Sequence, residues 1–244
     1  MNISGSGRIA AGEYNEKISV SGSGRLNGNI RCIALSCSGS VKGDGSVDCA
    51  EDVKVSGSCH IEQDIKARNI SVSGALKMGG DAYAVETIRM SGAVKCEGSI
   101  KCTTLKCSGC VNVNKEIAAE EIRISGWVKC DGLINAEKIC IDMSGSNNTS
   151  EVGAIGCSEI KVYNSNGGRK IGRVPIVKWF VKGSGDLKIA EAIEGDAVDI
   201  EYVTAPRVVG RIVTVGVGCE IELLQYSESV EIHPKAKVGK CEKI

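Results

Sequence analysis

A short motif recurs along the first half of the chain at a nearly constant interval. It consists of an apolar residue, a polar residue, a second apolar residue and a Ser-Gly pair, as in ISVSG at Ile70–Gly74. Successive motif glycines are 17 or 18 residues apart and fall at Gly5, Gly22, Gly39, Gly57, Gly74, Gly92, Gly109 and Gly126. A fixed period of this length is typical of solenoids, in which each repeat packs only on its neighbours.

The spacing of apolar residues within a repeat predicts strands. Counted from the first residue of the motif, apolar residues recur at positions 1 and 3, 7 and 9, and 13 and 15. A spacing of two is the period of a strand whose alternate side chains face inward. A spacing of six between pairs leaves room for three corners, and no segment has the helical i, i+3, i+4 pattern. We therefore predict an all-β fold, a three-sided parallel β-helix solenoid with about 17–18 residues per coil.

The motif also defines the expected core. Positions 1 and 3 form two inward-facing columns, which include Ile70, Val72, Ile88, Met90, Leu105, Cys107, Ile122 and Ile124. Position 15 holds only Cys or Ala in most repeats, which suits a narrow interior. The glycine of each Ser-Gly pair is predicted to occupy a corner that needs a positive φ.

The repeat changes character twice. Residues 1–145 form the regular block, and residues 146–172 are rich in Ser, Asn and Gly, which predicts a loop or a distorted coil. Residues 173–244 are again strand-like but less regular, and we expect a second β-helical block, with an antiparallel cap as the alternative. The middle segment could form a hinge between two blocks or a bulge in one.

Charge gives no reason to expect a nucleic acid or an anionic membrane as partner, because 30 basic residues balance 30 acidic ones. Outward position 8 nevertheless forms a mostly basic column, and position 10 a partly acidic one beside it. Mutual neutralisation of the two columns is favoured over a docking stripe for an anionic partner.

The sequence favours a cytoplasmic protein. No apolar run approaches the ~18 residues that span a bilayer, and the N-terminus lacks the regions of a signal peptide. The thirteen cysteines are therefore expected to be reduced. Only Cys110 and Cys241 are expected to be accessible.

No catalytic, cofactor-binding or metal site is predicted, and the chain is not expected to be an enzyme. Cys102, Cys107 and Cys110 have a spacing found in iron–sulfur and zinc proteins, but the repeat directs their side chains different ways. Two histidines, His60 and His233, cannot supply a three-histidine metal site. The Ser-Gly pairs recur in every repeat, so they indicate corners rather than a nucleophile.

The terminal coils are the predicted functional surfaces. An interior coil pairs its backbone with two neighbours, whereas a terminal coil leaves one row of polar groups unpaired. The first motif begins at residue 1, so we expect an open edge there that a second copy could extend. The residues predicted to take part in self-association are Met1, Ile3, Ile18, Val20, Val230 and Ile232.

These repeats resemble the bactofilins, polymer-forming cytoskeletal proteins of bacteria. The resemblance is carried by ISVSGSGRLNGNIRCIALSCSGSVKGDG (Ile18–Gly45) and, for the bactofilin-like proteins of Gram-positive bacteria, by AIEGDAVDIEYVTAPRVVGRIVTVGVGCEIELLQY (Ala192–Tyr226). It implies a right-handed β-helix and nucleotide-independent filaments that scaffold partners at the envelope. The body is longer than in the smaller members, and their proline-rich tails and membrane-binding N-terminal segment are not found.

We therefore expect a non-enzymatic cytoskeletal scaffold that self-assembles end to end through its terminal coils without nucleotide or cofactor. Its expected partners are itself and another bactofilin or an envelope-associated protein, without nucleic acid or direct membrane insertion. It would lie in the cytoplasm, at the inner face of the envelope through those partners. The alternatives are a trimeric acyltransferase-like enzyme with His60 or His233 at a cleft between subunits, and a monomeric β-helical adaptor that binds a partner along one face.

Overall fold

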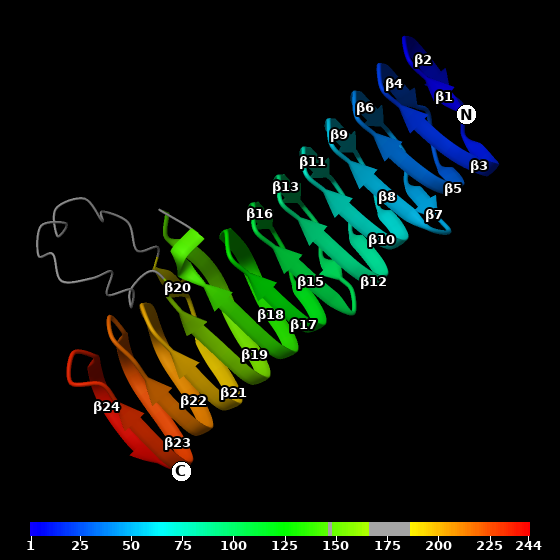
Figure 1. The fold of residues 1–244 in the computed structure, drawn as a ribbon. Coiled ribbons are helices and arrows are strands. Elements are labelled where there is room, and N and C mark those ends of the chain that lie inside the picture. The colour runs from blue at the N-terminus through cyan, green and yellow to red at the C-terminus, as the bar shows by residue number, and fades with distance from the viewer. Residues whose placement is uncertain (146–147, 166–185) are drawn as a thin grey trace, which may run out of the picture. The chain divides into compact units, whose positions relative to one another are not determined.

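The computed structural model describes residues 1–145, 148–165 and 186–244, which form two compact units, Met1–Glu120 and Glu121–Ile244. Strands hold 72% of the described residues, and the only helical element among these residues is a 3-10 turn at Met143–Gly145. Strands pair in parallel within each unit (Figure 1). The predicted all-β parallel solenoid is therefore confirmed.

Unit 1 is built from three ladders of strands, one for each apolar pair of the repeat. In the first ladder Ile70 is paired with Val53 and Ile88, its equivalents in the neighbouring repeats. The strands are β1 (Asn2–Ile3), β2 (Ser6–Ile9), β3 (Gly12–Val20), β4 (Ser23–Leu26), β5 (Ile30–Cys37), β6 (Ser40–Gly43), β7 (Val47–Cys49), β8 (Asp52–Val55), β9 (Ser58–Ile61), β10 (Ile65–Val72), β11 (Ala75–Met78), β12 (Ala82–Met90), β13 (Ala93–Cys96), β14 (Ile100–Lys101), β15 (Thr104–Cys107) and β16 (Cys110–Val113), while β17 (Ile117–Ile124) continues past Glu120.

Unit 2 repeats the architecture with longer strands. These are β18 (Trp127–Asp142), β19 (Ser150–Tyr163), β20 (Leu187–Ile189), β21 (Ala192–Ile200), β22 (Val203–Val215), β23 (Glu220–Ile232) and β24 (Lys237–Lys243). From Leu187 to Lys243 the pairing is parallel, as in a β-helical block rather than an antiparallel cap. Of the segment predicted as a loop or distorted coil, β19 forms a strand, and residues 146–147 and 166–172 lie outside the described residues.

The core is a set of aliphatic and cysteine columns. The eight residues named from positions 1 and 3 are each at most 4% exposed. Full burial of one such aliphatic side chain stabilises a fold by roughly 1.5–3 kcal/mol. Because the register stacks like residue on like residue, these contributions repeat from coil to coil.

The reason predicted for the Ser-Gly glycines is wrong. In the described residues only Gly12, Gly28 and Gly218 combine glycine with a positive φ, and none of them belongs to a Ser-Gly motif. The motif glycines are instead required by close stacking of the corners. A Cβ on Gly74 would lie 2.1 Å from the carbonyl oxygen of Gly57 in the preceding coil.

Substitution Gly74→Ala is therefore expected to destabilise the solenoid by about 1–3 kcal/mol or more, because the added methyl group must push two backbones apart. The measurement is the free energy of unfolding in denaturant. The matched control is Gly5→Ala, in the same motif of the first coil, where a Cβ would meet nothing within 4 Å. Equal losses in the two variants would contradict the stacking explanation.

Candidate self-association edges

The first coil of unit 1 has an open backbone edge. β1 pairs with β3 and β2 with β4, and no other strand of the described chain lies beside either. The carbonyl oxygens of Met1 and Ile3 accept hydrogen bonds from the N–H groups of Ser19 and Ser21, both at 2.9 Å. Alternate residues of a parallel ladder direct their polar groups to opposite neighbours. The N–H and C=O of Asn2 therefore face away from the second coil, where another strand could pair with them.

Side chains at this edge leave part of the core uncovered. Met1 is 40% exposed and Ile3 is half-buried, whereas Ile9 is buried. Tyr14 is paired with Cys32, so it stands at the position that holds Cys or Ala in the repeats that follow. Its hydroxyl donates to the carbonyl oxygen of Ala10 at 2.8 Å. Tyr14 is half-buried, and its aromatic side chain sets it apart from the small residues at the equivalent position of later coils.

Two of the residues predicted for self-association lie below the edge. Ile18 and Val20 are 0% and 1% exposed, because Met1 and Ile3 of the first coil stack on them. They can support the edge but cannot contact a second copy while the first coil is in place.

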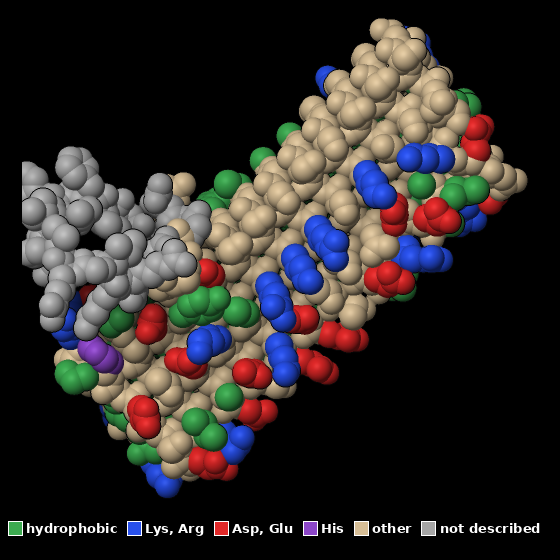
Figure 2. Space-filling view, viewed as in Figure 1, with side chains coloured by type: hydrophobic (Ala, Val, Ile, Leu, Met, Phe, Trp, Pro, Cys, Tyr) green, Lys and Arg blue, Asp and Glu red, His purple; other side chains and the backbone are tan. Residues whose placement is uncertain are grey.

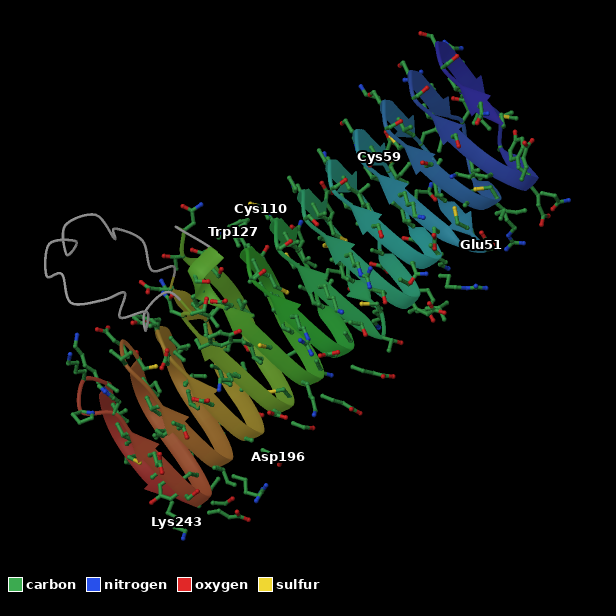
Figure 3. All side chains as sticks on the ribbon, viewed as in Figure 1. Glu51, Cys59, Cys110, Trp127, Asp196 and Lys243 are labelled. Carbon is green, nitrogen blue, oxygen red and sulfur yellow. The ribbon has the colours of Figure 1, made fainter. Side chains whose placement is uncertain are left out.

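The last coil of unit 2 presents a different edge. β24 pairs with β23 and, within the described part of the chain, with nothing else. Ile232 is 41% exposed and Val230 is half-buried, so both predicted residues lie near this edge. β24 itself carries Lys237, Lys240 and Lys243, the last of which is labelled in Figure 3. Lysine on an edge strand discourages pairing with another chain, so this edge is the poorer template of the two.

Neutralisation of the basic residues at outward position 8 is confirmed for only some of them. Lys77 and Lys95 each place Nζ 3.8 Å from Oε1 of Glu97. The prediction is wrong for the basic residues of the first three coils. Arg8, Arg25 and Lys42 have no ion pair anywhere in the described chain. The carboxylate of Asp44 accepts a hydrogen bond from the backbone N–H of Gly28 instead.

On the face that Figure 2 shows, basic and acidic side chains lie beside each other, and hydrophobic side chains form only small patches. Ion pairs of unit 1 include Arg31–Asp48 at 3.1 Å and Lys54–Asp52 at 3.0 Å. Exposed pairs of this kind contribute only about 0–1 kcal/mol each. They limit repulsion between stacked like charges rather than hold the fold together.

The cysteines are dispersed through the core. Cys110, at the start of β16, is exposed, whereas Cys59 is buried inside its coil (Figure 3). Cys107 is buried and Cys102 half-buried, and burial raises the pKa of their thiols to about 11 and about 12. The three cysteines with metal-like spacing thus differ in exposure, and no group of three or more His, Cys, Asp or Glu among the described residues could hold a metal ion.

Exposure and pKa together predict which thiols react. At neutral pH a soluble disulfide reagent should modify two of the thirteen thiols rapidly, Cys110 and Cys241, because these alone are exposed. Buried thiols such as Cys96 and Cys107, whose pKa is raised to about 11 by burial, should react only after unfolding or as the pH rises toward that value. Mass spectrometry of peptides after a short exposure identifies the modified sites. Rapid modification of Cys59 or Cys107 in the folded protein would contradict the burial.

The histidines lie in different units. His60 is half-buried on β9, and His233 is exposed after β23, where its Nδ1 accepts a hydrogen bond from the backbone N–H of Lys235 at 3.1 Å. No helix in the described residues is long and apolar enough to cross a membrane.

Comparison with known proteins identifies the N-terminal part of the chain. Residues 1–82 match the family model described as "Bactofilin: Polymer-forming cytoskeletal", so the resemblance read from the repeats is confirmed there. The match ends at Ala82, the first residue of β12, and covers about a third of the chain. No curated protein and no solved structure matches the chain.

Proposed function

We propose that this chain, which carries a bactofilin domain in residues 1–82, is a non-enzymatic cytoskeletal scaffold that self-assembles end to end without nucleotide. The family is polymer-forming and cytoskeletal, and the solenoid fold supports a scaffold role. The observation that carries the proposal is the open backbone edge of β1 and β2.

Strand addition supplies the interactions that such a contact needs. A second copy at the first coil would pair with the outward backbone groups of Asn2 and cover the exposed side chain of Met1 and the half-buried Ile3. Backbone hydrogen bonds and apolar burial form without a bound nucleotide. A head-to-head contact through this edge is isologous and closes as a dimer.

Growth beyond the dimer requires a second contact, which we assign to the edge of β24. Exposed Ile232 and half-buried Val230 provide apolar surface there. Lys237 and Lys240 are paired with Glu220 and Glu242, but β24 carries three lysines against one glutamate, and this excess positive charge repels that of a second copy. Filament growth would therefore depend on conditions or partners that offset this repulsion. We place the scaffold in the cytoplasm, at the inner face of the envelope, through another bactofilin or an envelope-associated protein.

The first edge is tested by Asn2→Pro. Proline removes only an N–H that faces away from the second coil, so the fold should be retained. Association through β1 should weaken by about tenfold, because one intermolecular hydrogen bond is lost. The measurement is light scattering with negative-stain electron microscopy, with and without ATP or GTP. Asn2→Ala, which keeps the N–H, should assemble like the unmodified protein.

Three outcomes would contradict the proposal. A monomer at every concentration would exclude self-assembly of the chain alone and favour the adaptor alternative. A discrete trimer would favour the acyltransferase-like alternative. Equal assembly of Asn2→Pro and Asn2→Ala would place the contact away from β1.

The second edge is tested by salt in the Asn2→Pro background, where the first contact is weakened. Raising the salt from about 10 mM to about 1 M shortens the Debye length from ~30 Å to ~3 Å, so repulsion between lysine-bearing edges should fall and tail-to-tail dimers should increase. Lys243→Gln, which removes an exposed lysine of β24 that has no ion pair among the described residues, should form more of these dimers at low salt. Dimers that dissociate as salt rises would contradict this assignment.

A further inference from the structure

One wall of unit 1 carries an unbroken column of basic side chains, which we call the basic column. Its members lie on the second ladder and are direct register partners in successive coils: Arg8, Arg25, Lys42, His60, Lys77 and Lys95. Adjacent strands lie about 4.8 Å apart. The column therefore holds up to six positive charges in a line along the stacking direction.

The column is not neutralised at its N-terminal end. Within the part of the chain that the structure describes, Lys77 and Lys95 are the members of the column that approach a carboxylate, and they share Glu97. Arg8, Arg25 and Lys42 are exposed and have no acidic partner among the described residues. A line of like charges this close is unfavourable unless something anionic lies along it.

A shallow groove runs beside these three residues. Its other side is formed by Ser6, Ser23 and Ser40, and its floor by Gly7 and Gly24. The serine hydroxyls and the basic side chains all offer hydrogen-bond donors to the same groove. Arginine in particular matches the geometry of phosphate oxygens. The groove is thus suited to a ligand that presents acceptors and negative charge at several successive points.

We propose that the basic column binds a linear polyanion of repeating phosphates that lies along the coils. Single-stranded nucleic acid is the less suitable occupant, because its bases stack on aromatic side chains. The six strands that carry the column contain no Phe, Tyr or Trp. They read SGRI, SGRL, SVKG, SCHI, ALKM and AVKC in chain order. A phosphate chain without bases accepts hydrogen bonds from these donors and needs no aromatic side chain for stacking. This site is lateral and does not depend on end-to-end assembly.

The test uses inorganic polyphosphate as the probe and the full chain as the protein. The variant Arg8→Gln/Arg25→Gln/Lys42→Gln removes three charges from the groove. The matched control, Lys66→Gln/Arg89→Gln/Lys106→Gln, removes three charges from exposed residues on the other walls of unit 1. None of these three has an ion pair with a described residue. Binding is measured by fluorescence anisotropy between about 50 and 200 mM salt.

The groove variant should bind polyphosphate at least about tenfold more weakly, and the slope of log affinity against log salt should fall by about 2, as for three lost phosphate contacts. The control should change affinity by less than about twofold at the higher salt. Both variants should unfold at the temperature of the unmodified protein, which shows that the loss is one of binding.

Several results would overturn the proposal. Absence of polyphosphate binding at low salt would contradict the proposal directly. An equal loss in the two variants would show attraction to overall charge rather than to the groove. Tighter binding of a single-stranded DNA of equal phosphate number would assign the wall to nucleic acid. Repeating the measurement with Asn2→Pro separates the two proposals, because polyphosphate binding should persist where assembly is weakened.

Discussion

Backbone hydrogen bonding between successive coils is the constraint on which the rest of this structure depends. Each coil pairs with the next through registered parallel strands, as in the bond from Ser19 N–H to the carbonyl oxygen of Met1 at 2.9 Å. The approach is so close at the corners that a Cβ on Gly92 would lie 1.9 Å from the carbonyl oxygen of Gly74. The recurrent glycine is thus a condition for continuous pairing rather than a special backbone conformation.

The same pairing makes the terminal coils the reactive edges of the solenoid. Interior coils use their backbone groups on both sides, whereas among the described residues the first and last coils pair on one side. The two edges are chemically different, since the first exposes Met1 and the last carries the lysines of β24. A polymer built through them would have two unequal contacts, and growth would be controlled at the weaker one.

Registered stacking also determines the lateral surface. Because equivalent residues of successive repeats lie side by side, a basic residue at one outward position becomes a column of charge. Where an acidic residue such as Glu97 stands nearby, it pairs with Lys77 and Lys95. Where it does not, as around Arg8 and Arg25, the wall keeps a charge that can be used for recognition. One architectural rule therefore produces both the assembly edges and the candidate binding wall.

The sequence by itself determined the period, the three strands per coil, the inward columns and the bactofilin resemblance. The period, the strands and the columns follow from spacing, because strand alternation and register leave a periodic chain one way to bury Ile70, Ile88 and their equivalents. The resemblance rests instead on the motifs of Ile18–Gly45 and Ala192–Tyr226. Only the tertiary structure decided that the first coil covers Ile18 and Val20, and which basic residues find a carboxylate. Those outcomes depend on distances between side chains of neighbouring coils. Side-chain rotamers and competing backbone donors set these distances, and the order of residues along the chain does not specify them.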